Sequence, residues 1–212
     1  MSNYLVLDNF TPLSLQNHIE QCLLSNDQVN WGYRPETSGV QDNWDKANKS
    51  IKENFQFEHN MYAYDNQNVF SPFFDIAKSN VYLLEQLLGP IDMLHRIKTN
   101  MLVKDVSTIG TYHPPHIDSA TENVFSMVYY VNDSDGDTIF FDRLVDGNST
   151  DTQQHIGLTE IGRVSPKKGR AVIFNSNRFH SSSNPIVNDR RVVINTVFLA
   201  SNVLANNIKS TL

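Results

Sequence analysis

The chain has 212 residues, of which 40% are hydrophobic and 19% charged, and its formal net charge is −6. This length suits a single domain with its own core, and the apolar content is too high for a disordered chain. The negative charge and the absence of a basic stripe disfavour nucleic acid as a partner, and no apolar run approaches the roughly 18 residues of a membrane span. The single cysteine, Cys22, and a start without a signal-peptide pattern predict a cytoplasmic protein.

The first half of the chain is expected to be largely helical. Residues 4–7 form a short apolar run, which predicts an opening strand. Thr11 and Pro12 then precede apolar residues at helical spacing, which predicts an amphipathic helix over residues 11–25. Residues 27–70 are polar and weakly periodic, so loops and short elements are expected there. A second helix is predicted over residues 72–88, where Gly89 and Pro90 end it.

From residue 96 the pattern changes to short β-branched and aromatic segments separated by turn signals. Strands are predicted over residues 97–103, 124–131, 138–141, 160–164, 171–174 and 192–199. Residues 132–137 are expected to form a turn, and residues 142–157 a polar insertion that leaves the sheet as a loop. This order indicates a mainly β fold with flanking α, in which N-terminal helices pack on a jelly roll. We expect one domain over residues 1–212, helical to about residue 95, with the β core from about 96 to 200.

A candidate metal site is indicated by His116 and Asp118. They are separated by one residue, so on an extended strand the imidazole and the carboxylate point to the same side. His180, which follows the strand predicted over residues 171–174, is the third candidate ligand. Two histidines and one carboxylate leave open positions on an octahedral ion, which suits non-haem Fe(II).

The surrounding sequence resembles a known family. His116-Ile117-Asp118, His180 and Arg191 resemble the His-x-Asp…His…Arg pattern of the Fe(II)/2-oxoglutarate-dependent dioxygenases, and in particular the prolyl-hydroxylase-like branch. Residues 128–132, 166–176 and 191–198 are similar to further motifs of that branch. The resemblance implies a double-stranded β-helix, and Fe(II), 2-oxoglutarate and O₂ as the cofactor set. It also implies hydroxylation of a C–H bond coupled to decarboxylation of 2-oxoglutarate to succinate and CO₂.

The same resemblance implies roles for individual residues. His116, Asp118 and His180 would be the metal ligands and the catalytic residues. Arg191 would bind the far carboxylate of 2-oxoglutarate, since a guanidinium forms two hydrogen bonds to a carboxylate and stays protonated. Arg190, on the opposite face of the strand, is expected to face solvent or to pair with an acid at the rim. Tyr130 is expected either to donate to that carboxylate or to be a core aromatic. Asn195, on the face of Arg191, is expected beside the iron.

Other residues near these motifs are assigned no metal role. His113 is expected at the rim of the site, and His18, His95 and His155 have no partner spacing. The aromatic-rich stretch over residues 31–64 and the polar insertion are expected to cross the mouth of the barrel. At least one member of a group of five aromatic residues should approach the opening: Trp31, Tyr33, Trp44, Tyr62 and Tyr64.

Two alternatives from other classes stay open. One is a cupin-like metal-dependent hydrolase in which the same ligands activate water, and the other is a non-catalytic jelly-roll binding module. The expected substrate is a small molecule or a peptide, with peptidyl proline, free amino acids and other metabolites all open. The sequence does not indicate an oligomeric state.

Overall fold

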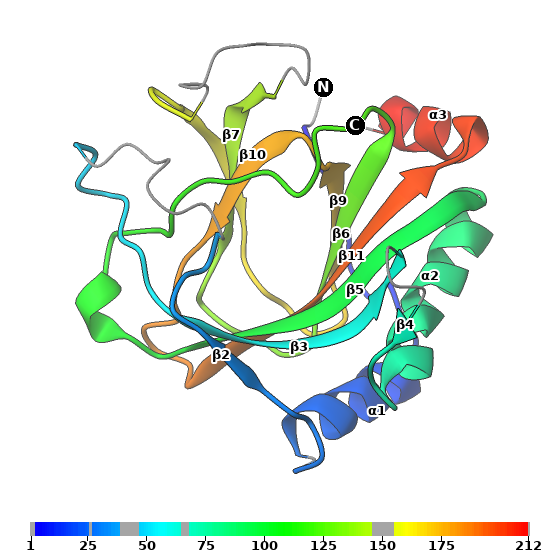
Figure 1. Ribbon diagram of the computed structural model, residues 1–212, viewed down its shortest axis with the longest axis horizontal. Helices are drawn as coiled ribbons and strands as arrows, with labels where there is room; N and C mark the ends of the chain where they lie inside the picture. Colours follow the sequence, from blue (N-terminus) through cyan, green and yellow to red (C-terminus); the bar gives the residue numbers. More distant parts are fainter. Residues whose placement is uncertain (1–2, 26, 39–46, 65–67, 146–154, 212) are drawn as a thin grey trace.

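Two antiparallel sheets form the centre of the computed structural model, which describes residues 3–25, 27–38, 47–64, 68–145 and 155–211 (Figure 1). The larger sheet has the strand order β1-β9-β6-β11-β5-β3-β2, with β4 paired to β3. Its strands are β1 (Leu5–Leu7), β2 (Gly32–Arg34), β3 (Gln56–Ala63), β4 (Asn68–Val69), β5 (Ile91–Val103), β6 (Val124–Tyr130), β9 (Ala171–Asn175) and β11 (Arg190–Ala200). The smaller sheet contains, in spatial order, β10 (Arg178–Ser182), β7 (Thr138–Leu144) and β8 (Glu160–Val164). The predicted mainly β fold is confirmed.

The α-helices of the described residues lie on one side of the larger sheet, away from the smaller sheet (Figure 1). They are α1 (Leu13–Leu24), α2 (Phe74–Leu88) and α3 (Asn202–Thr211). On α2 the buried residues Ala77, Val81 and Leu84 recur at helical spacing, and Gly89 ends the helix with a φ of 121° that other residues rarely adopt. No helix in the described ranges is long and apolar enough to cross a bilayer. The first two helices match the predicted positions, whereas α3 was not predicted.

Strand β11 shows how the larger sheet separates two environments. Ile194 and Phe198 belong to the apolar core between the sheet and the helices. Arg191, Val193 and Asn195 instead line a cavity on the inner face, because successive side chains of a strand point to opposite sides. Since β11 pairs with β5 on one side and β6 on the other, this inner face lies at the middle of the sheet.

The prediction of loops and short elements over residues 27–70 is wrong for β3, a strand of eight residues between β2 and β5. Its helix-facing side buries His59 and Met61, while the inner side carries Glu58 and Asn60. Polar residues on both faces hide the alternation that identifies a strand. The predicted helical part also ends too late, because β5 begins at Ile91 and His95 lies on a strand. Residues 142–144, assigned to the insertion, continue β7.

Candidate active site

The three candidate ligands His116, Asp118 and His180 come together at one cavity, which all three line. One ligand atom from each lies within 4.8 Å of the others. His116 and His180 face each other across an isolated bridge, in which each backbone N–H donates to the other's carbonyl at 2.9 Å. The backbone N–H of Asp118 donates to the carbonyl of Ser176 at 2.9 Å. Backbone hydrogen bonds to β10 and to the turn before it therefore fix the loop that carries His116 and Asp118.

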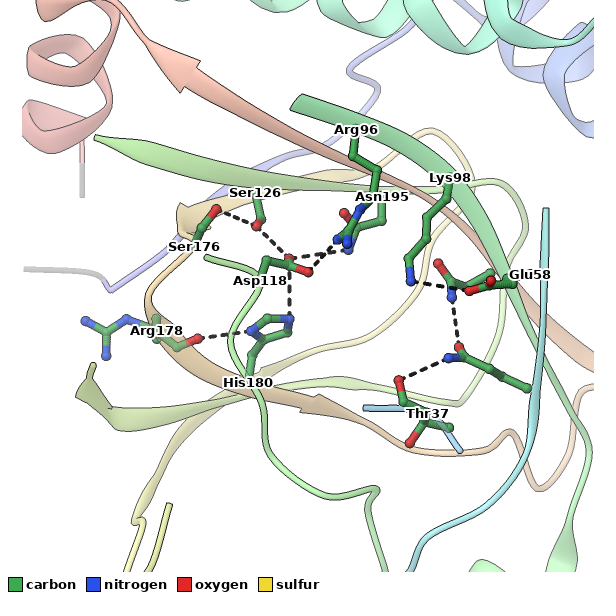
Figure 2. A network of polar contacts seen from close by, with 12 residues as sticks. Thr37, Glu58, Arg96, Lys98, Asp118, Ser126, Ser176, Arg178, His180 and Asn195 are labelled. Carbon is green, nitrogen blue, oxygen red and sulfur yellow. Dashed lines mark hydrogen bonds and ion pairs between the residues drawn. The ribbon is translucent and has the colours of Figure 1, made fainter. Parts of the chain in front are cut away.

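The carboxylate of Asp118 is held from several sides (Figure 2). Its Oδ1 accepts a hydrogen bond from Nη2 of Arg96 at 2.8 Å, and its Oδ2 accepts one from Oγ of Ser126 at 2.6 Å. Nε2 of His180 lies 3.7 Å from Oδ2, and Nδ2 of Asn195 lies 3.4 Å from the same oxygen. Burial raises the pKa of Asp118, but the neighbouring His180 and Arg96 outweigh burial and hold the pKa below its usual range. Asp118 is therefore an anion in a fixed orientation.

Both histidines present Nε2 to the site. Nδ1 of His180 donates to the carbonyl of Arg178 at 3.0 Å, and Nδ1 of His116 contacts the carbonyl of Pro114 at 3.4 Å. Such contacts leave the lone pair of Nε2 available to a metal. Burial, with the charge of His180, lowers the pKa of His116 to about 3, so its imidazole is neutral near pH 7. Two imidazole nitrogens and one carboxylate are a donor set that fits Fe(II).

Arg191 lies inside the barrel, only 4% exposed, and lines the same cavity as the three ligands. Its Nε donates to the carbonyl of Gly136 and its Nη2 to Oγ1 of Thr138, each at 2.8 Å. Within the described residues no carboxylate forms an ion pair with this guanidinium, and burial lowers its pKa. A buried cation without a counter-ion is costly, so the cavity is prepared for an anion. Arg190, by contrast, is exposed as expected.

Tyr130 is fully buried and its hydroxyl donates to Oγ1 of Thr138 at 2.6 Å. The ring also lies 5.7 Å from the guanidinium carbon of Arg191. Thr138, not Tyr130, lines the cavity, so the tyrosine reaches the site through the threonine hydroxyl. Sequence reasoning missed Thr138, although a polar residue at the first position of a buried strand was a usable signal.

Asn195 lies beside the ligands, as its position on β11 predicts. Its Nδ2 is directed to Asp118, whereas its Oδ1 is buried without a hydrogen-bond partner among the described residues. A buried acceptor left unpaired favours a further donor at this position when the site is filled.

Arg96, Lys98 and Ser126 are site residues that sequence reasoning missed. Arg96 and Lys98 alternate with the core residue Ile97 on β5, and Ser126 is a polar residue in the otherwise apolar strand β6. Polar residues at every second position of a buried strand are a signal for an inner polar face. The predicted strand boundaries excluded Arg96 by one residue.

The aromatic residues of the 31–64 stretch divide between the core and the surface. Trp31 and Tyr62 pack against the core between sheet and helices, so they belong to the scaffold. Tyr33 is 61% exposed and lines a cavity of about 530 Å³ together with Glu58 and Arg96. Trp44 and most of the polar insertion lie outside the described residues.

The prediction that His113 lies at the rim of the site is wrong, because its side chain is buried, with 2% exposure. Its Nε2 donates to Oδ1 of Asn184 at 2.7 Å, and its Nδ1 accepts from Oγ of Ser182 at 3.1 Å. This network uses both ring nitrogens, and His113 is outside the ligand cluster. Burial lowers its pKa from 6.5 to about 4.

The buried neutral His113 should make the protein less stable in mild acid. The unfolded chain takes up this proton below about pH 6.5 and the folded protein only below about pH 4, so the free energy of unfolding falls as the pH drops between these values. Between about pH 7.5 and pH 5, His113 should account for a loss of about 2 kcal/mol. Urea unfolding of the wild type and of His113→Asn at both pH values measures it. The exposed His18→Asn variant is the matched control, and an equal pH dependence in wild type and His113→Asn would contradict the prediction.

Comparison with known proteins agrees with this geometry. The sequence model of the 2OG-Fe(II) oxygenase superfamily matches residues 102–199, which contain the three candidate ligands and Arg191. Among curated protein sequences, no relative matches this chain.

Solved structures share the fold at low sequence identity. A 2OG-Fe(II) oxygenase-family oxidoreductase from Burkholderia pseudomallei is 13% identical, with a TM-score of 0.62 over 96% of this chain and 88% of that one. A Trichoplax adhaerens prolyl hydroxylase, solved with a peptide fragment of hypoxia inducible factor, is 14% identical, with a TM-score of 0.55 over 96% and 86%. HygX from Streptomyces hygroscopicus, solved with nickel and 2-oxoglutarate, is 10% identical, with a TM-score of 0.56 over 95% and 84%. Over residues 102–199, which include most of the β core, the chain is therefore similar to the 2OG-Fe(II) oxygenase superfamily.

Proposed function

We propose that this chain is a hydroxylase in which His116, Asp118 and His180 hold Fe(II) and Arg191 holds the far carboxylate of 2-oxoglutarate. One observation carries the proposal: a buried arginine that forms no ion pair with any described carboxylate shares a cavity with a cluster of two histidines and one carboxylate. The cation matches a dianionic cosubstrate, and the cluster matches a metal with open positions.

The neighbouring residues orient these groups. Arg96 and Ser126 each bind one oxygen of Asp118, so that carboxylate is positioned before a metal binds. Tyr130 orients the hydroxyl of Thr138, which lies beside the guanidinium of Arg191. This hydroxyl is available to the far carboxylate of 2-oxoglutarate. Asn195 adds a buried acceptor that has no hydrogen-bond partner in the described part of the chain, suited to a donor on a bound molecule or water.

The chemistry itself comes from the cofactor set. With Fe(II) and O₂ bound, decarboxylation of 2-oxoglutarate to succinate and CO₂ supplies an oxidant that converts a C–H bond to C–OH. The protein holds the reacting groups together and keeps bulk water away. A metal-dependent hydrolase would give Arg191 no anion to bind, and a binding module would not need the ligand cluster.

The proposal extends to the partners of the protein. Its substrate is a small molecule or a peptide, the two classes reached by structurally similar enzymes. We place the protein in the cytoplasm, because its one cysteine, Cys22, has no partner in the chain with which to form a disulfide. We also treat residues 1–212 as one domain.

Consumption of 2-oxoglutarate tests the function. The full chain, incubated with Fe(II), ascorbate and 2-oxoglutarate in air, should release succinate, at least slowly in the absence of substrate. Zn(II) in place of Fe(II) should abolish the release of succinate. A metal-dependent hydrolase, by contrast, would remain active with Zn(II). The absence of Fe(II)-dependent succinate, with and without candidate substrates, would reject the proposal.

A further inference from the structure

The side chains on the inner face of the larger sheet change from apolar to charged between one edge of the sheet and the other. Over β6 and β9 this face is mostly apolar, with Val128, Val172 and Phe174 packed together and Ser126 as a polar exception. Over β5, β3 and β2 the inward positions carry charged side chains: Arg96 and Lys98 on β5, Glu58 on β3 and Arg34 on β2. These charges line a cavity of about 270 Å³ that also reaches His116 and Asp118.

The cations of this cavity have few carboxylates as ion-pair partners (Figure 2). Arg34 forms an ion pair with Glu58, and Nζ of Lys98 lies 3.6 Å from the same carboxylate. Arg96 pairs with Asp118, while its Nε is buried without a hydrogen-bond partner among the described residues. One glutamate therefore serves two cations, and the third cation depends on a candidate metal ligand.

The cavity has an excess of positive charge once the metal site is assigned. Asp118 would give its charge to the metal, so among the described lining residues Arg34, Arg96 and Lys98 face the carboxylates of Glu36 and Glu58 alone. Burial and the nearby charge of Arg96 lower the pKa of Lys98, and the carboxylates of Glu58 and Asp118 offset this shift only in part. An anion bound between Lys98 and Arg96 would stabilise the charges of both side chains.

We propose that this cavity is the substrate subsite and that it binds an anionic group, a carboxylate or a phosphate, of a small-molecule substrate through Lys98 and Arg96. The inference rests on the proposed function, since the adjoining metal site is where the substrate would react. A subsite with more cations than carboxylates beside the metal disfavours a neutral substrate, because the cations would lose water on binding without gaining a further negative partner.

The cosubstrate is a competing anion for these cations. Arg191 lies on β11 with hydrogen bonds to Gly136 and Thr138, and Lys98 lies on β5 next to Glu58. The two cations line one cavity together with the metal ligands, so 2-oxoglutarate on Arg191 would leave Lys98 and Arg96 to the substrate. The KM for the substrate and the KM for 2-oxoglutarate, measured in a Lys98 variant, show which of the two molecules Lys98 binds.

A panel of matched compounds tests the charge of the substrate. Succinate release by the full chain, with Fe(II) and saturating 2-oxoglutarate, is measured with small carboxylates and their primary amides, and with phosphomonoesters and their parent alcohols. End-blocked peptides and amines complete the panel. At least one anion should stimulate release roughly tenfold or more, and its uncharged counterpart should not; the carboxylate and phosphate arms identify the group. Stimulation by neutral, cationic or peptide compounds alone, or by none, would overturn the subsite.

A single substitution then tests the residue. Lys98→Met should raise the KM for the stimulating anion about tenfold or more and leave the KM for 2-oxoglutarate within about twofold. Lys104→Met is the matched control, because Lys104 is exposed just beyond the same strand, and should change neither value. A rise in the KM for 2-oxoglutarate alone would assign Lys98 to the cosubstrate and overturn the proposal. If the wild type consumes no 2-oxoglutarate under any condition, the proposed function fails first and the subsite fails with it.

Discussion

Replacing Arg191 with alanine is expected to raise the KM for 2-oxoglutarate by roughly 30-fold to several thousand-fold. The variant leaves the far carboxylate without its counter-charge in a site that is 4% exposed, and breaking such a buried charged pair costs about 2–5 kcal/mol. It also removes the donors to Gly136 and Thr138. Succinate release as a function of 2-oxoglutarate concentration measures the effect.

The neighbouring arginine supplies the control. Arg190 is exposed and points to the other side of β11, so Arg190→Ala should change the KM for 2-oxoglutarate less than about threefold. Arg191→Lys keeps the charge but loses the planar two-pronged donor, and an intermediate KM is expected. Equal effects of the two alanine variants, or a larger one at Arg190, would reject the assignment of Arg191.

Removing one metal ligand should lower the affinity for Fe(II) by a similarly large factor. His180→Ala is expected to weaken Fe(II) binding at least ~100-fold and to abolish turnover, because two of three ligands remain. His180 lies within β10, 4% exposed and 4.7 Å from the ring of Phe174, so the variant also leaves a cavity and a lower melting temperature is expected. Anaerobic equilibrium dialysis measures the Fe(II) affinity directly, without activity.

The control for this variant is His18→Ala, which removes an exposed histidine of α1. It should bind Fe(II) like the wild type. Circular dichroism separates loss of the ligand from loss of the fold. Fe(II) binding by a folded His180→Ala protein at wild-type affinity would contradict the assignment of the metal site.

The apolar and turn patterns of the second half were sufficient to predict most of the core strands. Alternation in β11 correctly placed Arg191 and Asn195 on one face, because that strand is buried on both sides and its register with β5 is regular there. The helices α1 and α2 were also predictable, since each buries one apolar stripe. Local periodicity is informative wherever one face is uniformly apolar.

The charged part of the inner face could not be predicted in the same way. β3 carries polar residues on both sides, and its inward Glu58 is paired with residues from β2 and β5 that are distant in sequence. Such pairs depend on strand order, which a single sequence does not contain. The burial of His113 follows likewise from its contacts with Ser182 and Asn184, brought close by the pairing of its loop with β10.

Anaerobic titration of the wild-type protein with Fe(II) and 2-oxoglutarate tests whether the metal ligands and Arg191 form one binding site. We expect a weak visible charge-transfer band that forms when both are present, saturates with 2-oxoglutarate, and is absent with Zn(II) or with His180→Ala. We also expect Arg191→Ala to need far more 2-oxoglutarate to form the band than Arg190→Ala does. A folded wild-type protein that binds Fe(II) but gives no such band with saturating 2-oxoglutarate would contradict a shared site for the metal and 2-oxoglutarate.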